Sequence, residues 1–111
     1  MTSYSAPSVA IKNIELRSSS LMQIIERSLP EQGAIEVQHD QSYKEHPWHC
    51  HETDETIIIL KGSLQFKWED ETQICNPGTV IELPKGQFHG SVAMENGATY
   101  VIAFHKIDVG A

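Results

Sequence analysis

The chain has 111 residues, 40% hydrophobic and 21% charged, which is typical of one globular domain with its own core. Eight basic residues against fifteen acidic ones give a net charge of −7, which argues against nucleic acid and membranes as partners, because both need clustered Lys and Arg. The apolar run 56–60 is far too short to span a bilayer, and we see no signal-peptide pattern. The chain has two cysteines, Cys50 and Cys75. We expect both to be free thiols, in a cytoplasmic protein.

Two elements are predicted in the N-terminal segment 1–33, an edge strand over 9–16 and a helix over 18–29. Serines can cap the start of the helix, and Pro30 ends it. The apolar stripe of this helix is formed by Leu21, Ile25 and Leu29. A stripe of this kind favours a helix that covers the main domain over one that binds a partner.

After Gly33 the apolar period changes from helical to two. Ile35, Val37 and His39 alternate with charged or amide residues, so we expect these three side chains on the inner face of a strand. Short strands bounded by Gly, Pro and Asn turns then follow, at about 49–51, 55–61, 63–69, 71–76, 79–83, 89–94 and 98–106. Many short strands without intervening helices predict an all-β sandwich or jelly-roll barrel over 34–106, followed by a tail, 107–111.

One segment of the β region carries potential metal ligands. His49 and His51 are two residues apart, which on a strand places both imidazoles on one face, and Glu55 follows at the bend into the next strand. A third imidazole, His89, lies in the segment that begins at Gly78. Three imidazoles and one carboxylate suit a divalent transition metal and leave two positions of an octahedral ion open.

The spacing of these residues resembles the two signature motifs of the cupin superfamily. The matched positions, in order, are His49, His51, Glu55, Gly62, Gly78, Pro84, Gly86 and His89. Two motif positions differ, since Tyr43 stands where the first motif begins with Gly and Ala93 where the second ends with Asn. The resemblance covers about residues 34–105 and implies a double-stranded β-helix barrel with a metal held by the three histidines and Glu55.

The pocket can be predicted from strand parity. If the histidines and Glu55 face inward, the lining includes Ile57, Ile59, Phe66, Trp68, Ala93 and His39, with Ser91 facing inward and Phe88 at the rim. Such a pocket is mostly aromatic and aliphatic, which suits a small, partly apolar substrate that chelates a metal. Cys50 has outward parity, and Trp48 is interpreted as a packing residue at the barrel mouth, with a substrate platform as the alternative.

The strand 55–61 is apolar on both faces. Ile57 and Ile59 serve the core, so Ile58 and Leu60 need a cover of their own. Family resemblance favours a homodimer with this face at or near the interface, and the N-terminal helix is the competing cover.

The expected function is that of a metal-dependent enzyme acting on a small molecule, with oxygen chemistry of the dioxygenase kind as the leading reaction. The alternatives are a metal-dependent isomerase or lyase, a non-catalytic ligand-binding or sensory domain, and a relic site that binds no metal. One divalent ion per chain is expected, and Fe, Mn, Ni, Co, Cu and Zn all accept these ligands.

Overall fold

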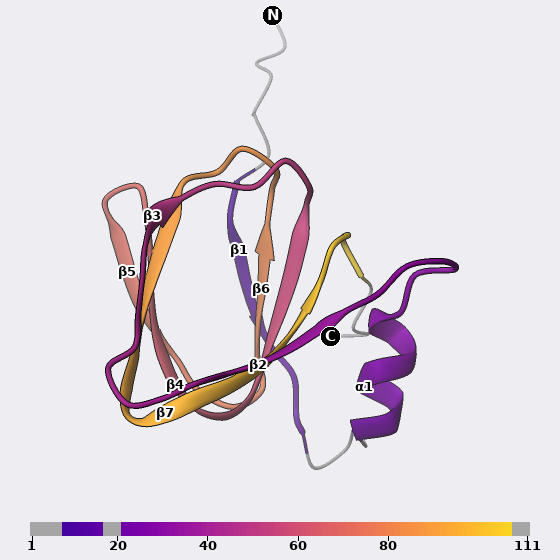
Figure 1. Cartoon of the computed structure of the whole chain (residues 1–111), viewed down its shortest axis with the longest axis horizontal. Coiled ribbons are helices and arrows are strands. Elements are labelled where there is room, and N and C mark those ends of the chain that lie inside the picture. Colours follow the sequence, from indigo (N-terminus) through magenta and orange to yellow (C-terminus); the bar gives the residue numbers. More distant parts are fainter. Residues whose placement is uncertain (1–7, 17–20, 108–111) are drawn as a thin grey trace, which may run out of the picture.

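A computed structural model describes residues 8–16 and 21–107 and shows an antiparallel β-barrel with one short helix beside it (Figure 1). The strands are β1 (Ala10–Asn13), β2 (Glu36–Asp40), β3 (Glu45–His49), β4 (Glu55–Trp68), β5 (Glu71–Cys75), β6 (Thr79–Leu83) and β7 (His89–Ala103), and the helix is α1 (Leu21–Ser28). The predicted all-β jelly-roll class with an N-terminal helix is confirmed. Within the described residues, no helix has the length and apolar character needed to cross a membrane.

The sheet is organised around two long strands. The strand order is β1-β6-β4-β7-β2, with β3 also paired to β7 and β5 to β4. β4 and β7 have 14 and 15 residues, so the breaks predicted at residues 61–62 and 95–97 are wrong. Each strand bends there and continues, and the β4–β7 register shifts near Gly62. Gly62 has a φ of 74°, and a Cβ on it would lie 2.1 Å from the carbonyl oxygen of Gly97, so the bend requires glycine.

The inner face of β4 has the predicted parity. Ile57 and Ile59 are buried in one apolar cluster with Leu64, Phe66 and Ala93. Phe66 also stacks on the ring of His89, with centroids 5.6 Å apart. The core therefore supports one side of the His89 imidazole, whose ring also lies 4.3 Å from that of His49, measured between centroids.

The outer face of β4 is covered within the chain. Ile58 is 1% exposed and packs in a second cluster with Ile24 of α1, Val80, Ala103 and Ile107. Figure 1 shows α1 beside the barrel, and Ile24 of this helix packs with Ile107, the last described residue. A partner chain is therefore not needed to bury Ile58, because the competing cover, the N-terminal helix, packs on this face through Ile24. The homodimer itself stays a prediction, to be checked by sedimentation at micromolar concentration.

The helix uses a different face from the predicted stripe. Ile24 and Ser28 are buried, whereas Leu21 and Leu29 are 57% and 48% exposed. α1 is only eight residues long, and the hydroxyl of Ser28 donates to the carbonyl of Ile24 at 2.7 Å. Because this internal bond satisfies Ser28, a polar residue can occupy the buried face, which the apolar pattern alone did not predict.

Strand β2 presents the opposite face to the one predicted. Val37 is 63% exposed, whereas Asp40 is 3% exposed. Ile35 precedes the strand and packs in the outer cluster with Ile58, so the polar residues of β2 face inward. His39 consequently lies exposed, with its Nδ1 atom 2.8 Å from the Thr99 hydroxyl. Apolar residues mark the inner face only where that face lacks functional polar groups.

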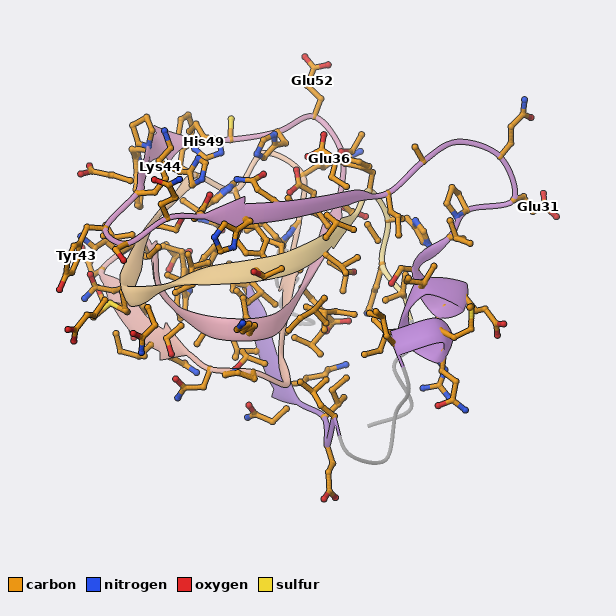
Figure 2. The ribbon with its side chains drawn as sticks, turned by 60° about the horizontal axis from the view of Figure 1, so that its bottom comes forward. Glu31, Glu36, Tyr43, Lys44, His49 and Glu52 are labelled. Atoms are coloured by element: carbon orange, nitrogen blue, oxygen red, sulfur yellow. The ribbon has the colours of Figure 1, made fainter. Side chains whose placement is uncertain are left out.

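The turn between β2 and β3 contains a strained residue. Tyr43, at the motif position where the family has glycine, has a φ of 62° and is 64% exposed, at the outer end of the loop (Figure 2). A left-handed conformation costs a non-glycine residue about 1 kcal/mol. We expect Tyr43→Gly to raise the free energy of unfolding by up to about 1 kcal/mol, measured by urea denaturation. Tyr43→Ala keeps the strain and should give no gain.

Candidate metal centre

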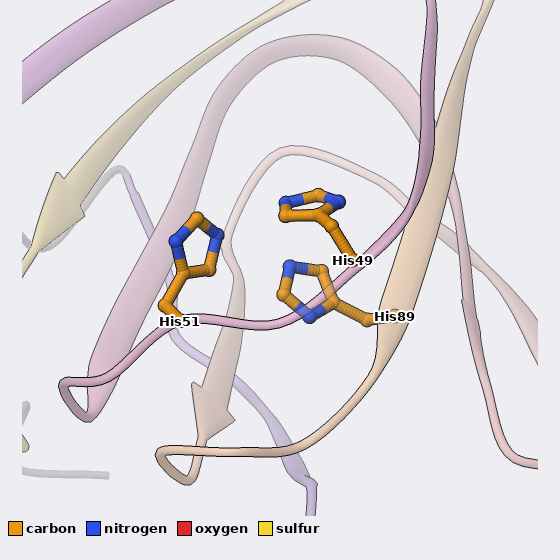
Figure 3. A group of neighbouring side chains, drawn as sticks. All are labelled: His49, His51 and His89. Atoms are coloured by element: carbon orange, nitrogen blue, oxygen red, sulfur yellow. The ribbon is translucent and has the colours of Figure 1, made fainter.

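Three imidazoles meet at one end of the barrel. His49 ends β3, His51 follows it in the loop, and His89 begins β7. β3 and β7 are paired with His49 opposite His89, so the sheet register fixes two of the three rings. Ring nitrogens from the three residues lie within 4.8 Å of one another, and Figure 3 shows the rings gathered around a common space. They form a group that could hold a metal ion.

The imidazoles are held in a form suited to metal binding. The Nδ1–H groups of His49 and His89 can donate to the carbonyls of Pro47 and Gln87, the second at 2.9 Å, which leaves each Nε2 lone pair free. Burial lowers the pKa of His89 to about 4. Burial and the neighbouring His49 also lower the pKa of His51. At neutral pH His89 is therefore unprotonated and able to bind a cation.

Glu55 supplies a carboxylate beside the imidazoles. Its Oε2 atom is buried without a hydrogen-bond partner and lies 3.4 Å from Nδ1 of His51, too far for a good hydrogen bond. Burial, followed by the nearby Glu36, raises the pKa of Glu55 to about 7. A buried carboxylate oxygen without a partner is costly for the fold, and a cation at the histidine group would supply the missing partner.

A cavity of about 280 Å³ opens beside the histidines and Glu55. Its apolar lining residues are Ile57, Leu64, Phe66, Ile102 and Phe104. Its other polar lining residues are Glu36, Gln38, His46, Ser91 and Tyr100. The cavity is therefore more polar than predicted, because the inward residues of β2 bring amide and acidic groups to it.

The predicted pocket residues fall in several places. Ile57 and Phe66 line the cavity, and Ser91 does too. Ile59 and Ala93 face inward but lie fully buried in the core, with Trp68 packed against it. Phe88 and Trp48 are 49% and 53% exposed and do not line the cavity, and neither does His39. Both cysteines are free, Cys50 exposed and Cys75 buried.

A polar cluster on the cavity wall was missed by the sequence analysis. The buried carboxylate of Asp40 accepts hydrogen bonds from Tyr100 Oη at 2.7 Å, from His46 Nε2 at 3.0 Å and from Gln38 Nε2 at 3.1 Å. Burial alone would raise the pKa of Asp40, but these three hydrogen bonds hold it below its usual value. The sequence feature that could have indicated this cluster is the alternation of polar residues at positions 36, 38 and 40, which places them on one face of the strand.

Comparison with known families and structures identifies the fold independently. The family model of the cupin domain matches residues 34–105. No curated protein matches the chain. A solved cupin-2 domain protein of Shewanella frigidimarina is 29% identical, with a TM-score of 0.54 over 61% of this chain and 66% of that one. The chain thus spans slightly less than two thirds of that protein.

Two more distant structures cover more of the chain. A DUF861 family protein of Thermotoga maritima is 18% identical, with a TM-score of 0.60 over 87% of this chain and 99% of that one. A cupin superfamily protein of Desulfitobacterium hafniense is 12% identical, with a TM-score of 0.59 over 95% and 84% of the two chains. At these identities the similarity concerns the fold alone.

Proposed function

The chain belongs to the cupin domain family, and on that premise we propose that it is a metal-dependent enzyme that acts on a small molecule in the barrel cavity. The observation that carries the proposal is the histidine group of His49, His51 and His89 at the wall of that cavity. A family fold alone does not fix a reaction, so the proposal rests on the donor set and on the groups around it.

The residues present fit a divalent transition metal. Imidazoles together with a carboxylate are a common donor set for such ions. The group that the structure brings together is His49, His51 and His89, and the unpartnered Oε2 of Glu55 is proposed as the fourth ligand. One divalent ion per chain is proposed. Such a metal would supply Lewis acidity, or a centre for oxygen chemistry, to a substrate that binds at its open positions.

Oxygen chemistry of the dioxygenase kind is the leading reaction of the proposal. The imidazole-rich donor set suits iron and other redox-active ions, and the apolar half of the cavity excludes water from a bound substrate. Phe66, on the apolar side of the cavity, is buried and stacks on the ring of His89. A small substrate with one or two chelating oxygens fits the volume of about 280 Å³.

A metal-dependent isomerase or lyase is the second candidate. The observation that favours it is the hydrogen-bonded His46 beside Asp40, which provides a group for moving a proton within the cavity. The proposal places the enzyme in the cytoplasm, where Cys50 and Cys75 stay reduced. A non-catalytic ligand-binding domain remains the alternative outside the enzyme class.

The metal content of the protein tests the proposal. We expect protein purified without an affinity tag to contain about one equivalent of a divalent transition metal per chain, because the three imidazoles are already grouped within 4.8 Å of one another. Elemental analysis measures this directly. Iron would support oxygen chemistry, and zinc would favour the isomerase or lyase. Protein that neither carries such a metal nor takes one up on dialysis would contradict the proposal.

A further inference from the structure

The polar cluster around Asp40 has the arrangement of a supported proton acceptor. His46, Gln38 and Tyr100 all line the cavity, whereas Asp40 does not line it and is 3% exposed. The side chain of His46 is 28% exposed. The imidazole of His46 therefore lines the cavity and is hydrogen-bonded to the buried carboxylate of Asp40.

The hydrogen bonds determine which nitrogen of His46 carries the proton. Nε2 lies 3.0 and 3.1 Å from the two oxygens of Asp40 and 2.9 Å from the amide nitrogen of Gln38. The two hydrogens of that amide are donated to Asp40 and Tyr100, and an ionised carboxylate only accepts hydrogen bonds, so Nε2 carries the hydrogen that it shares with Asp40. Tyr100 donates its hydroxyl to Asp40 and accepts from Gln38 at 2.9 Å, so the phenol oxygen is also held in place. In neutral His46 the lone pair is then on Nδ1, which has no hydrogen-bond partner among the described residues.

Tyr100 does not compete for this role. Burial and the adjacent Asp40 raise the pKa of its phenol, so its hydroxyl keeps its proton. The remaining ionisable residues that line the cavity are Glu36, Glu55, His49, His51 and His89. Of these, Glu36 is exposed, and the other four belong to the proposed metal centre. His46 differs from them in its hydrogen bond to the buried carboxylate of Asp40.

We propose that His46 accepts a proton at Nδ1 from the ligand bound in the cavity, with Asp40 as its positioning residue. The inference rests on the proposed function and defines the ligand class, a small molecule with a metal-binding oxygen and an acidic O–H or C–H next to it. The bond from the ligand to that hydrogen breaks, its electron pair stays on the ligand, and the new imidazolium is balanced by the carboxylate of Asp40.

The test uses zinc-loaded protein and the probe 4-nitrocatechol, whose visible absorption changes when its second hydroxyl loses a proton. At pH 7 the probe bound to wild-type protein should be mostly doubly deprotonated. His46→Gln keeps a donor to Asp40 but cannot take up a proton, so the ratio of doubly to singly deprotonated bound probe should fall about tenfold or more. His39→Gln, in an exposed histidine, is the matched control and should leave the ratio unchanged.

A second variant tests whether Asp40 orients the imidazole of His46 or only stabilises the fold. In Asp40→Asn, the amide can donate to Nε2 of His46 and move the imidazole proton to Nδ1. Long-range proton–nitrogen NMR spectra should show His46 with its proton on Nε2 in wild-type protein and on Nδ1 in the variant. The variant should also lose the deprotonation of the probe. Finding the proton on Nδ1 of His46 in neutral wild-type protein would overturn the inference.

Titration with zinc alone distinguishes this inference from the proposed function. His46→Gln should bind zinc as wild-type protein does. If it does so and still deprotonates the bound probe fully, the role of His46 is wrong and the metal centre stands. If wild-type protein shows no zinc-dependent binding of the probe, the proposed function fails, and the inference fails with it.

Discussion

Replacing His51 with alanine is expected to weaken the binding of a divalent metal by more than a hundredfold. Loss of a residue that only supports a metal ligand already costs roughly 10–100-fold in affinity, and loss of a ligand should cost more. His51 suits the test because its side chain is 41% exposed, so its removal leaves no cavity in the core. Competition with a chromophoric chelator for zinc measures the effect.

His39→Ala is the control for this experiment. His39 is an exposed histidine, and its Nδ1 atom contacts Thr99. Its removal should change zinc affinity by less than about twofold, while the unfolding midpoints of both variants stay close to that of wild-type protein. If His51→Ala retains wild-type affinity, the histidine group is not the metal centre.

The sequence predicted the members of the histidine group because their positions depend on local geometry. The His49-x-His51 spacing and the place of His89 at the start of a strand are fixed by short segments. The paired register then brings His49 opposite His89. Strand parity also predicted the burial of Ile57 and Ile59, since both faces of that strand are apolar and the inward Glu55 indicates which face is the inner one.

The Asp40 cluster could not be predicted in the same way. It joins β2, β3 and β7 through long-range hydrogen bonds, with Asp40 and Tyr100 60 positions apart. The apolar pattern of β2 indicated the wrong face, because Ile35 packs outward against the cluster under α1. A polar inner face is favourable only when every buried group finds a partner, and those partners are set by the assembled barrel.

Replacing Glu55 with glutamine is expected to stabilise the metal-free protein at pH 8. The folded environment raises the pKa of Glu55 to about 7 from its usual 4.5, which corresponds to about 3 kcal/mol of unfavourable ionisation above pH 7. Glutamine has the same shape and no charge, but its buried amide also needs partners. We therefore expect a gain of about 2 kcal/mol in the free energy of unfolding, measured by urea denaturation.

The pH dependence of this gain follows from the direction of the pKa shift. Between pH 4.5 and 7 the folded protein holds a proton on Glu55 that the unfolded chain has lost, so Glu55 lowers the stability progressively as the pH rises through this window. The gain from Glu55→Gln should therefore be small at pH 5 and full at pH 8. Glu52→Gln, in an exposed residue of the loop that leads into β4, should show no such change.

Metal should reverse the effect of the same substitution. With zinc bound, the Oε2 atom that lacks a partner in the metal-free protein gains a cation, so wild-type protein should be stabilised by zinc more than Glu55→Gln is. Glu55 would then destabilise the metal-free protein and stabilise the zinc-bound protein. That combination indicates a role in metal binding rather than in packing. Equal stabilisation of the two proteins by zinc would show that Glu55 is not a ligand, even if the three histidines are.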